Sequence, residues 1–339
     1  IISRVSAGAG GGRNFVGGND EINGRLLWQW FSVPPSGGDP EWDFKDAAKG
    51  NINPYPGDWG ANDLIGGGSI FSLIAVDEST GIIYFPTGAP ALSYDASIRP
   101  GPNLYANSVV ALDANTGEMI WYHQTTPHDI NGHEPTRSLI LANATVNGEE
   151  RKVILSSTKG DYAYVFDAAT GELLHDPISF GAQKISAYNT NQGNNADMNL
   201  SQNILEGRDY CPGAFGGAAS TSAFADNTFF VASQNYCSKF NVGQVPYKDK
   251  MINGFQIEPS LAGQSSTVHA IDVSTGKIKW TFPMESRYQG GVTVSGGVVY
   301  LVDLSGNFYA LDSETGAVSY THLRAHETRH DVVCRLLLE

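Results

Sequence analysis

Polar residues in the middle of the chain have types and spacings that could support acid–base or metal chemistry. Asp129 and Glu134 lie on one short stretch, and two carboxyl groups can act as general acid and base. His123, His128 and His133 repeat every five residues, which places them on one face of neither a helix nor a strand. We therefore interpret the histidines as loop and pocket residues rather than as metal ligands, and no spacing rule supports an acid–base pair of Asp129 with Glu134.

Two cysteines, Cys211 and Cys237, lie on either side of a predicted hairpin formed by residues 222–225 and 228–232. Such a hairpin could bring its flanks within the roughly 4.4–6.8 Å between Cα atoms that a disulfide needs. An even pair of cysteines in a chain of exported type favours one disulfide, and two free buried thiols are the alternative.

The composition excludes several classes of function. The net charge is −14 without a basic block, so a nucleic-acid partner is not expected. No apolar run approaches the roughly 18 residues that a membrane span requires. High glycine content with only 17% charged residues is typical of short strands and tight turns, and an acidic, sparsely charged chain favours a periplasmic or extracellular location.

A repeated motif is the strongest signal in the sequence. Its complete copies are Val110–Trp121 and His269–Trp280, which share Ala-x-Asp-x-x-Thr-Gly-x-x-x-Trp. Tyr164–Gly171 and Tyr309–Gly316 keep the first part of the motif, and Asn19–Trp28 is a degenerate copy. Repeats of this kind predict an architecture built from equivalent units.

Each copy predicts a β-hairpin. An apolar strand ends at the Asp, whose short side chain can accept backbone N–H groups across the turn. The Gly supplies the positive φ of a tight turn. The return strand then reaches a Trp whose ring can fill the gap between neighbouring sheets, so Trp28, Trp121 and Trp280 are expected to be buried there.

The repeated glycines predict the number of units. They are Gly24, Gly81, Gly117, Gly171, Gly276 and Gly316, where Gly81 belongs to the half-match Ile74–Gly81. They are 36 to 57 residues apart, except for one double gap between Gly171 and Gly276, and one four-stranded blade for each interval of ordinary length fits this spacing. The prediction is an all-β chain in which residues 1–317 form about five to six four-stranded blades with almost no helix.

The motif resembles the tryptophan-docking repeat of the quinoprotein alcohol dehydrogenases, which use pyrroloquinoline quinone (PQQ). Pro100–Asp113, Tyr122–Asp129 and Tyr210–Gly216 are also similar to stretches of that family. The resemblance implies that the chain is a fragment of an eight-bladed β-propeller. In methanol-dehydrogenase-like members the cysteines that match Cys211 and Cys237 pair, which adds to the case for a disulfide.

In this family PQQ lies on the propeller axis, and the resemblance assigns four residues to its pocket. Ser6 and Ser69 lie in stretches that border the cofactor, and Phe71 stands where the family has a stacking Trp. Lys159 matches the Arg or Lys that contacts the quinone oxygens. We expect Lys159 to be the main, uncompensated charge facing the axial cavity, where a carboxylate-rich molecule such as PQQ could bind.

Other family positions have lost their functional side chains. The metal-binding Glu and Asn correspond to Ala9 and Ala89, the catalytic Asp to Gly132, and a further pocket Asn to Ala219. Calcium and lanthanide ions need about six to eight oxygen ligands, so neither is expected in the axial site. Asp129 is the candidate to replace the base, although its position is more typical of a turn residue.

The resemblance implies oxidation of a small alcohol, with electrons passed to a cytochrome c or a quinone. The lost ligands leave a second function open, that of a non-catalytic propeller that acts as a scaffold or binds a partner protein. A third function is that of a PQQ enzyme with a rearranged site. The fold alone does not choose among the three, because function depends on the site.

The end of the chain departs from the repeat. Ser319–Thr328 resembles the translation of a transposon-end sequencing adaptor, and Asp331–Glu339 resembles the outer half of that adaptor. We therefore expect residues 318–339 to be a non-native tail that packs poorly.

Overall fold

The computed structural model describes residues 2–4, 14–33, 58–60, 66–70, 72, 74–91, 99–181, 209–213, 215–247, 250–259 and 264–322. Ser6, Ala9 and Phe71, which were expected near the cofactor, lie outside this part of the chain. The described residues form strands, turns and loops, and none of them forms a helix long and apolar enough to cross a membrane.

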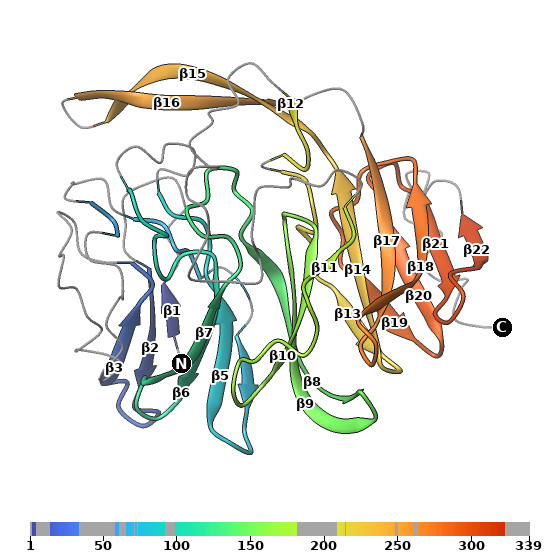
Figure 1. Cartoon of the computed structure of the whole chain (residues 1–339), viewed down its shortest axis with the longest axis horizontal. Coiled ribbons are helices and arrows are strands. Elements are labelled where there is room, and N and C mark those ends of the chain that lie inside the picture. Colours follow the sequence, from blue (N-terminus) through green and yellow to red (C-terminus); the bar gives the residue numbers. More distant parts are fainter. Residues whose placement is uncertain are drawn as a thin grey trace, which may run out of the picture.

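Five antiparallel sheets follow one another along the chain like the blades of a propeller (Figure 1). The first blade comprises β1 (Ile2–Arg4), β2 (Phe15–Asn19) and β3 (Leu26–Phe31), and the second β4 (Ala75–Asp77), β5 (Ile82–Pro86), β6 (Ser108–Asp113) and β7 (Met119–Gln124). The third comprises β8 (Pro135–Val146), β9 (Glu149–Thr158), β10 (Tyr162–Asp167) and β11 (Ile178–Ser179). The fourth comprises β13 (Ala223–Ala225), β14 (Thr228–Asn235), β17 (Ser265–Asp272) and β18 (Lys277–Met284), and the fifth β19 (Thr293–Ser295), β20 (Val298–Val302), β21 (Phe308–Asp312) and β22 (Val318–His322).

The all-β prediction is confirmed, and two details of the blade count need correction. Gly81 ends the turn between β4 and β5, where Asp77 pairs with Ile82, so it lies inside the second blade and does not begin another. The long interval between Gly171 and Gly276 holds an insertion in the fourth blade rather than a further blade. This insertion is a three-stranded sheet of β12 (Asp209–Tyr210), β15 (Ser238–Tyr247) and β16 (Lys250–Pro259), which lies across the upper end of the blades in Figure 1.

The first strands of successive blades lie next to one another. β4 contacts β8, β8 contacts β13, and β13 contacts β19. Because the strands within each blade follow in order, the last strands lie on the outside. This arrangement is that of a propeller, in which the first strand of every blade is the innermost.

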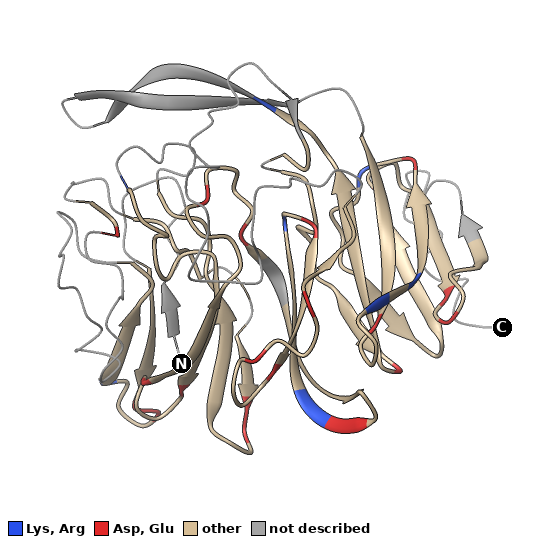
Figure 2. Ribbon diagram, in the orientation of Figure 1, with Lys and Arg blue, Asp and Glu red and all other residues tan. Residues whose placement is uncertain are grey.

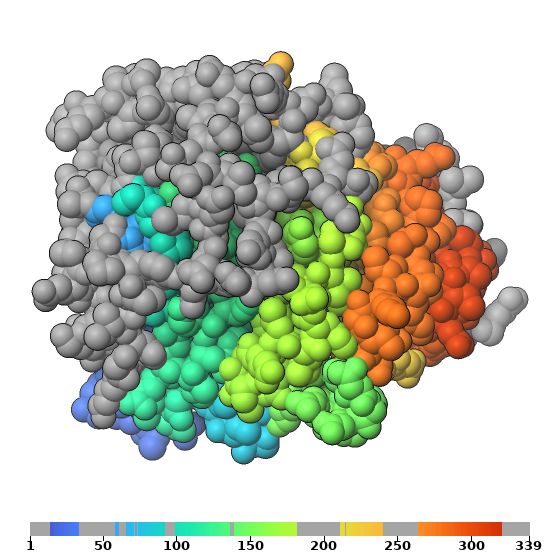
Figure 3. Space-filling model, in the orientation of Figure 1, coloured from blue at the N-terminus to red at the C-terminus, as the bar shows by residue number. Residues whose placement is uncertain are grey.

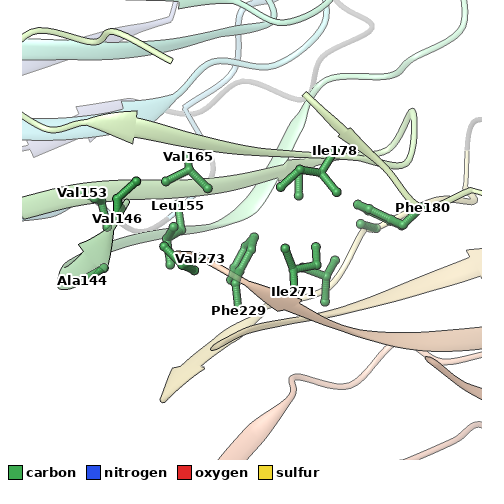
Figure 4. Close-up of a cluster of buried hydrophobic side chains, with 13 residues drawn as sticks. Ala144, Val146, Val153, Leu155, Val165, Ile178, Phe180, Phe229, Ile271 and Val273 are labelled. Atoms are coloured by element: carbon green, nitrogen blue, oxygen red, sulfur yellow. The ribbon is translucent and has the colours of Figure 1, made fainter. Parts of the chain in front are cut away.

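Apolar side chains fill the space between blades. Figure 4 shows the cluster between the third and fourth blades, where Leu155 and Val165 face Phe229 and Ile271. All four are at most 1% exposed, and each buried side chain of this size contributes about 1.5–3 kcal/mol. Figure 3 shows the same two blades, yellow-green and orange, meeting along a continuous boundary.

A repeated contact joins each outer strand to the next blade. Trp28 Nε1 donates to the carbonyl oxygen of Ala114 at 3.0 Å, and Trp121 Nε1 donates to that of Ala168 at 2.9 Å. Trp280 Nε1 donates to the carbonyl oxygen of Ser313 at 3.0 Å. Each acceptor directly follows the Asp of the motif in the next blade. In each case the ring covers the Thr-Gly turn of the next blade, and its N–H group donates to the carbonyl oxygen that follows the Asp. We call this arrangement the inter-blade clasp.

The third blade has no Trp at the clasp position, and a histidine replaces it. His175 Nε2 lies 2.8 Å from the carbonyl oxygen of Val273, which directly follows Asp272. Its ring covers Gly276, the turn glycine of the fourth blade. The motif Tyr164–Gly171 therefore lacks the Trp without losing the clasp.

The motif aspartates cap their turns as predicted. Asp113 Oδ1 accepts the backbone N–H groups of Asn115 at 2.8 Å and Thr116 at 2.9 Å, and Asp167 and Asp312 make equivalent bonds. Acidic residues consequently collect at the lower end of the blades, in red in Figure 2. Lys152 Nζ of the third blade lies 2.7 Å from Asp77 Oδ2 of the second, and this contact lowers the pKa of Asp77 well below its usual range.

β22 completes the fifth blade. It pairs with β21 from Phe308↔His322 to Leu311↔Val318. Val318 and Tyr320 are about half exposed, at 47% and 53%. The assignment of residues 318–339 to a non-native tail stays a prediction, and residues 323–339 lie outside the described part.

Candidate functional site

Lys159 and Glu134 meet at the end of the third blade opposite its Thr-Gly turn. Glu134 directly precedes β8 and Lys159 directly follows β9, and the register of these strands places Pro135 opposite Thr158. The two residues that extend this pairing therefore face each other. Lys159 N donates to the carbonyl oxygen of Glu134 at 3.1 Å, which fixes their backbones together.

The side chains form a largely buried ion pair. Lys159 Nζ lies 3.0 Å from Glu134 Oε1, and the side chains are 15% and 13% exposed. The expectation that Lys159 would be an uncompensated charge is therefore wrong. The hairpin register is the physical reason, because it brings a carboxylate from a distant part of the sequence to the ammonium group.

The ion pair has unused hydrogen-bonding capacity. Among the described residues, the buried Glu134 Oε2 has no hydrogen-bond partner. Lysine carries three N–H donors, and within the same residues the ammonium of Lys159 reaches Glu134 alone. Burial raises the pKa of Glu134, and the charge of Lys159 opposes that rise. The pair thus offers a hydrogen-bond acceptor of raised basicity beside free cationic donors.

Asp129, the sequence candidate for a base, organises the loop that leads to Glu134. It is fully buried, and its Oδ1 accepts the N–H groups of Asn131 at 2.8 Å and Gly132 at 3.1 Å. Its Oδ2 accepts from His133 N at 2.9 Å and from Asn107 Nδ2 at 2.7 Å. Both carboxylate oxygens are thereby engaged, which fits a turn residue better than a proton acceptor.

Gly132, the position matched to the family's catalytic Asp, has a φ of +73°. A residue with a β-carbon would be strained there. The loop is therefore shaped by a glycine at this position, and the carboxylate that reaches Lys159 comes from Glu134 instead.

The histidines near this loop do not form a metal cluster. His133 Nε2 lies 2.9 Å from the carbonyl oxygen of Pro212, and His128 Nδ1 lies 2.7 Å from that of Gly101. Burial lowers the pKa of His123 to about 4. Within the described ranges, no group of three or more His, Cys, Asp or Glu could hold a metal ion.

The predicted disulfide between Cys211 and Cys237 is present, with a Cα–Cα distance of 4.5 Å. It ties the segment that follows Tyr210 to the end of β14. Because Pro212 contacts His133, the disulfide also holds this segment beside the Glu134 loop.

Gly217 brings the same segment against Lys159. A β-carbon on Gly217 would lie 1.9 Å from the carbonyl oxygen of Lys159, so only glycine permits this approach. Gly217 also exchanges backbone hydrogen bonds with Gln234, at 2.9 and 3.0 Å. Ala219, the position matched to a pocket Asn, donates its N–H to Gly217 O at 2.9 Å.

Ser69 and Ala89 lie on adjacent segments of the second blade. Ser69 is 3% exposed, and its carbonyl oxygen accepts the N–H of Gly88 at 2.8 Å. An isolated bridge pairs Gly67 with Pro90. The structure thus brings together two positions that the resemblance assigned to cofactor and metal binding, while a contact of Ser69 with a cofactor stays a prediction.

Two contacts in this region escaped the sequence analysis, the ion pair of Glu134 with Lys159 and the stacking of Arg287 on Tyr236. The first had a usable signal, since both residues flank strands that form one hairpin. The second had none, because Tyr236 follows β14 and Arg287 follows β18, two strands of the fourth blade that are far apart in the sequence and not adjacent in the sheet.

Comparison with known proteins agrees with this architecture. Residues 9–179 match the family model described as "Glucose/ethanol/alcohol dehydrogenase, beta-propeller domain", and residues 260–335 match that of "Outer membrane protein assembly factor BamB".

The chain is 28% identical over 356 residues to the putative dehydrogenase XoxF of Paracoccus denitrificans, covering 94% of this chain and 57% of that protein. It is 34% identical over 184 residues to the quinohemoprotein alcohol dehydrogenase ADH-IIG of Pseudomonas putida, covering 51% of this chain and 25% of that protein. The chain spans about half the length of the curated relatives that it matches along most of its sequence.

Solved structures show the same fold. A quinohemoprotein alcohol dehydrogenase, ADHIIG from Pseudomonas putida HK5, superposes with a TM-score of 0.75 at 21% identity, covering 95% of this chain and 51% of that one. A europium-containing methanol dehydrogenase superposes with a TM-score of 0.71 at 22% identity, covering 94% and 58%. By its blades, its clasps and its match to the family model, the chain belongs to the glucose/ethanol/alcohol dehydrogenase β-propeller family.

Proposed function

We propose that this protein is a PQQ-dependent dehydrogenase that oxidises a small alcohol, with Lys159 facing the quinone oxygens and Glu134 accepting the hydroxyl proton. The observation that carries the proposal is the buried ion pair of these residues, 3.0 Å apart, whose donors and acceptor are only partly used. Family membership supplies the class of reaction.

The residues present fit the cofactor in their chemistry. A quinone with several carboxylates offers acceptor oxygens, which suit the N–H donors of Lys159 that no other described residue uses. An alcohol hydroxyl is a donor, which suits Glu134 Oε2, an atom without a hydrogen-bond partner in the described part of the chain. PQQ, when bound, supplies the two-electron acceptor for the oxidation.

The chain's own residues then perform three tasks. Glu134 takes the hydroxyl proton, and its raised pKa makes it a stronger base than an exposed carboxylate. Lys159 holds positive charge and N–H donors where negative charge develops, and burial strengthens this interaction. Asp129 positions Glu134 through the backbone of residues 131–133.

The proposal includes no calcium or lanthanide ion in the family's axial site, because Ala9 and Ala89 offer no side-chain oxygen. It extends to a cytochrome c as electron acceptor and to a periplasmic or extracellular location. Support for the acceptor comes from relatives named as quinohemoproteins and from one named "Lupanine 17-hydroxylase [cytochrome c]".

The test is reconstitution of the protein with PQQ alone and with PQQ plus calcium or lanthanum. Cofactor binding is followed by quenching of tryptophan fluorescence, and turnover by dye reduction with ethanol. We expect metal-independent turnover that falls about 100-fold or more in Glu134→Gln, with PQQ binding retained. Glu21→Gln, at an exposed turn, is the matched control and should be unaffected.

Three outcomes contradict the proposal. Turnover that depends on metal and is abolished by a chelator would restore a metal site. Binding of PQQ without turnover under any condition would favour the non-catalytic binding propeller, a function supported by the lack of a carboxylate at position 132. Absence of PQQ binding would remove the quinoprotein assignment.

A further inference from the structure

A second cation lies near the candidate site and takes no part in the chemistry proposed above. Arg287 follows β18 in the loop that leads to β19. Its guanidinium lies 4.0 Å from the ring centroid of Tyr236, and its Nε donates to Gln234 Oε1 at 3.3 Å. Among the described residues, no carboxylate forms an ion pair with it.

Gln234 has a donor group that is buried and unused. Arginine can only donate hydrogen bonds, so the amide atom that faces Arg287 must be the oxygen. The NH₂ group must then point elsewhere. Gln234 is 1% exposed, and its Nε2 has no hydrogen-bond partner in the described part of the chain. A buried donor left unpaired is destabilising, so a ligand with an acceptor oxygen would be stabilised here.

The surroundings hold Arg287 in place. Tyr236 is 7% exposed and is followed directly by Cys237, which the disulfide fixes to Cys211. Phe215 packs edge-on against Tyr236, with ring centroids 6.4 Å apart. A guanidinium stacked on a fixed aromatic ring is preorganised for planar, bidentate recognition of a carboxylate.

This arrangement is one backbone pair away from the Lys159–Glu134 ion pair. Gln234 exchanges both backbone hydrogen bonds with Gly217, and Gly217 lies directly against the Lys159 carbonyl group. Gly217 thus links the backbone of Gln234, which contacts Arg287, to the backbone of Lys159.

We propose that Arg287 and Gln234 form a carboxylate-binding subsite beside Lys159 and Glu134. One guanidinium and one neutral amide match a single negative charge with two acceptor oxygens, which is the pattern of a carboxylate rather than a doubly charged phosphate. This inference deepens the proposed function and rests on it only for the source of the carboxylate, which is either PQQ or a hydroxy-acid substrate.

The first experiment measures malonate binding to the cofactor-free protein by isothermal titration calorimetry. We expect one binding site, an affinity at least about tenfold lower in Arg287→Gln, and no change in Arg25→Gln, which removes an exposed arginine. Gln234→Glu should also abolish binding, because the new carboxylate would occupy the guanidinium. Arg287→Lys keeps the positive charge but loses the planar guanidinium that can donate two parallel hydrogen bonds, so it should retain only part of the malonate affinity.

These results separate the subsite from the proposed function. Malonate binding that survives in Glu134→Gln and Lys159→Gln supports the subsite even if the protein never oxidises an alcohol. The subsite is refuted if malonate fails to bind the unmodified protein, or if Arg287→Gln and Gln234→Glu, folded by circular dichroism, bind it as Arg25→Gln does.

A second experiment identifies the source of the carboxylate. If the cofactor occupies the subsite, PQQ displaces malonate and Arg287→Gln lowers PQQ affinity about tenfold or more. If the substrate occupies it, PQQ affinity is unchanged and Arg287→Gln raises the KM for glycolate but not for ethanol. Displacement of malonate by neither PQQ nor glycolate would exclude both sources and overturn the inference.

Discussion

A β-carbon placed on Gly171 would lie 2.5 Å from Cδ2 of Trp121 in the preceding blade. Gly171 also has a φ of +72°. Two features therefore require glycine at this position, the left-handed backbone and the Trp121 ring that lies directly on it. The turn glycine of the repeat is thus as much part of the clasp as the tryptophan.

Gly171→Ala should therefore destabilise the protein more than Gly148→Ala does. Both positions have positive φ, at +72° and +84°, so backbone strain destabilises both alanine variants by about 1–2 kcal/mol. Gly148 has no atom within 4 Å of its would-be β-carbon, whereas Gly171 has Trp121. Urea unfolding of the two variants measures the difference, and equal losses would mean that the ring shifts at no cost.

His175 should tolerate, and gain from, replacement by tryptophan. Its ring already lies on Gly276 and its Nε2 on the Val273 carbonyl oxygen. We expect His175→Ala to lower the free energy of unfolding by about 1–3 kcal/mol through loss of the ring's contact with Gly276 and of the bond to Val273. His175→Trp should match or exceed the unmodified protein. A strongly destabilised His175→Trp variant would show that this junction is shaped for imidazole alone.

The buried His269 should make the protein less stable in acid. It is 4% exposed beside Phe180, and burial lowers its pKa from 6.5 to about 4. Between these values the unfolded chain binds more protons than the folded one, so stability falls as the pH drops through this window. The full effect is on the order of 3 kcal/mol. His269→Phe should flatten the pH dependence of the unfolding midpoint, and an unchanged slope would place the acid sensitivity elsewhere.

Removing the disulfide should cost stability at the site as well as globally. Cys211 and Cys237 are 26 residues apart, and closing a loop of this size contributes about 3 kcal/mol in the chain-entropy model. We expect the Cys211→Ser/Cys237→Ser double variant to lose roughly this amount in urea unfolding, and to lose malonate affinity, because Tyr236 adjoins Cys237. Unchanged malonate binding would mean that Arg287 does not depend on this support.

The Lys159–Glu134 pair should behave as a buried pair in a double-mutant cycle. Lys159→Met alone leaves a buried carboxylate uncompensated and should cost about 3–5 kcal/mol. Adding Glu134→Gln should recover much of the loss. The exposed pair of Arg151 with Glu149, 2.8 Å apart, is the control, and Arg151→Met should cost about 1 kcal/mol or less. Additive losses for Lys159 and Glu134 would indicate that the two side chains are not coupled.

The blades could be predicted from sequence because the residues that form each turn of the motif are close together in the sequence. Asp113 and Gly117 determine their hairpin through contacts within a few residues, so the pattern is visible without the fold. The Gly81 half-match was misleading for the same reason. The turn of Asp77 follows similar rules, yet joins the two inner strands of a blade rather than its outer pair.

The site could be predicted only in part, because its paired side chains are far apart in the sequence and are brought together by strand register and by loops. Lys159 was found through a matched motif, whereas Glu134 required the register of β8 against β9. Arg287 meets Gln234 and Tyr236 because the loop that follows β18 comes back to the end of β14, and nothing in the local sequence encodes that meeting. The carboxylate of Asp129 was visible as a candidate, but its four hydrogen bonds were not.

The clasps also determine how the chain can be divided. Each ring belongs to one blade and its glycine to the next, so no blade contains a complete clasp of its own. A single excised blade would expose an unsupported indole on one side and an uncovered turn on the other. The contacts that hold the chain together therefore lie at the junctions between blades. Weakening one junction should leave the blades on each side of it joined to one another. Because each of these four junctions places a ring from one blade on the turn glycine of the next, copying or deleting a blade preserves a workable junction, which gives such chains a simple route to change their length in evolution.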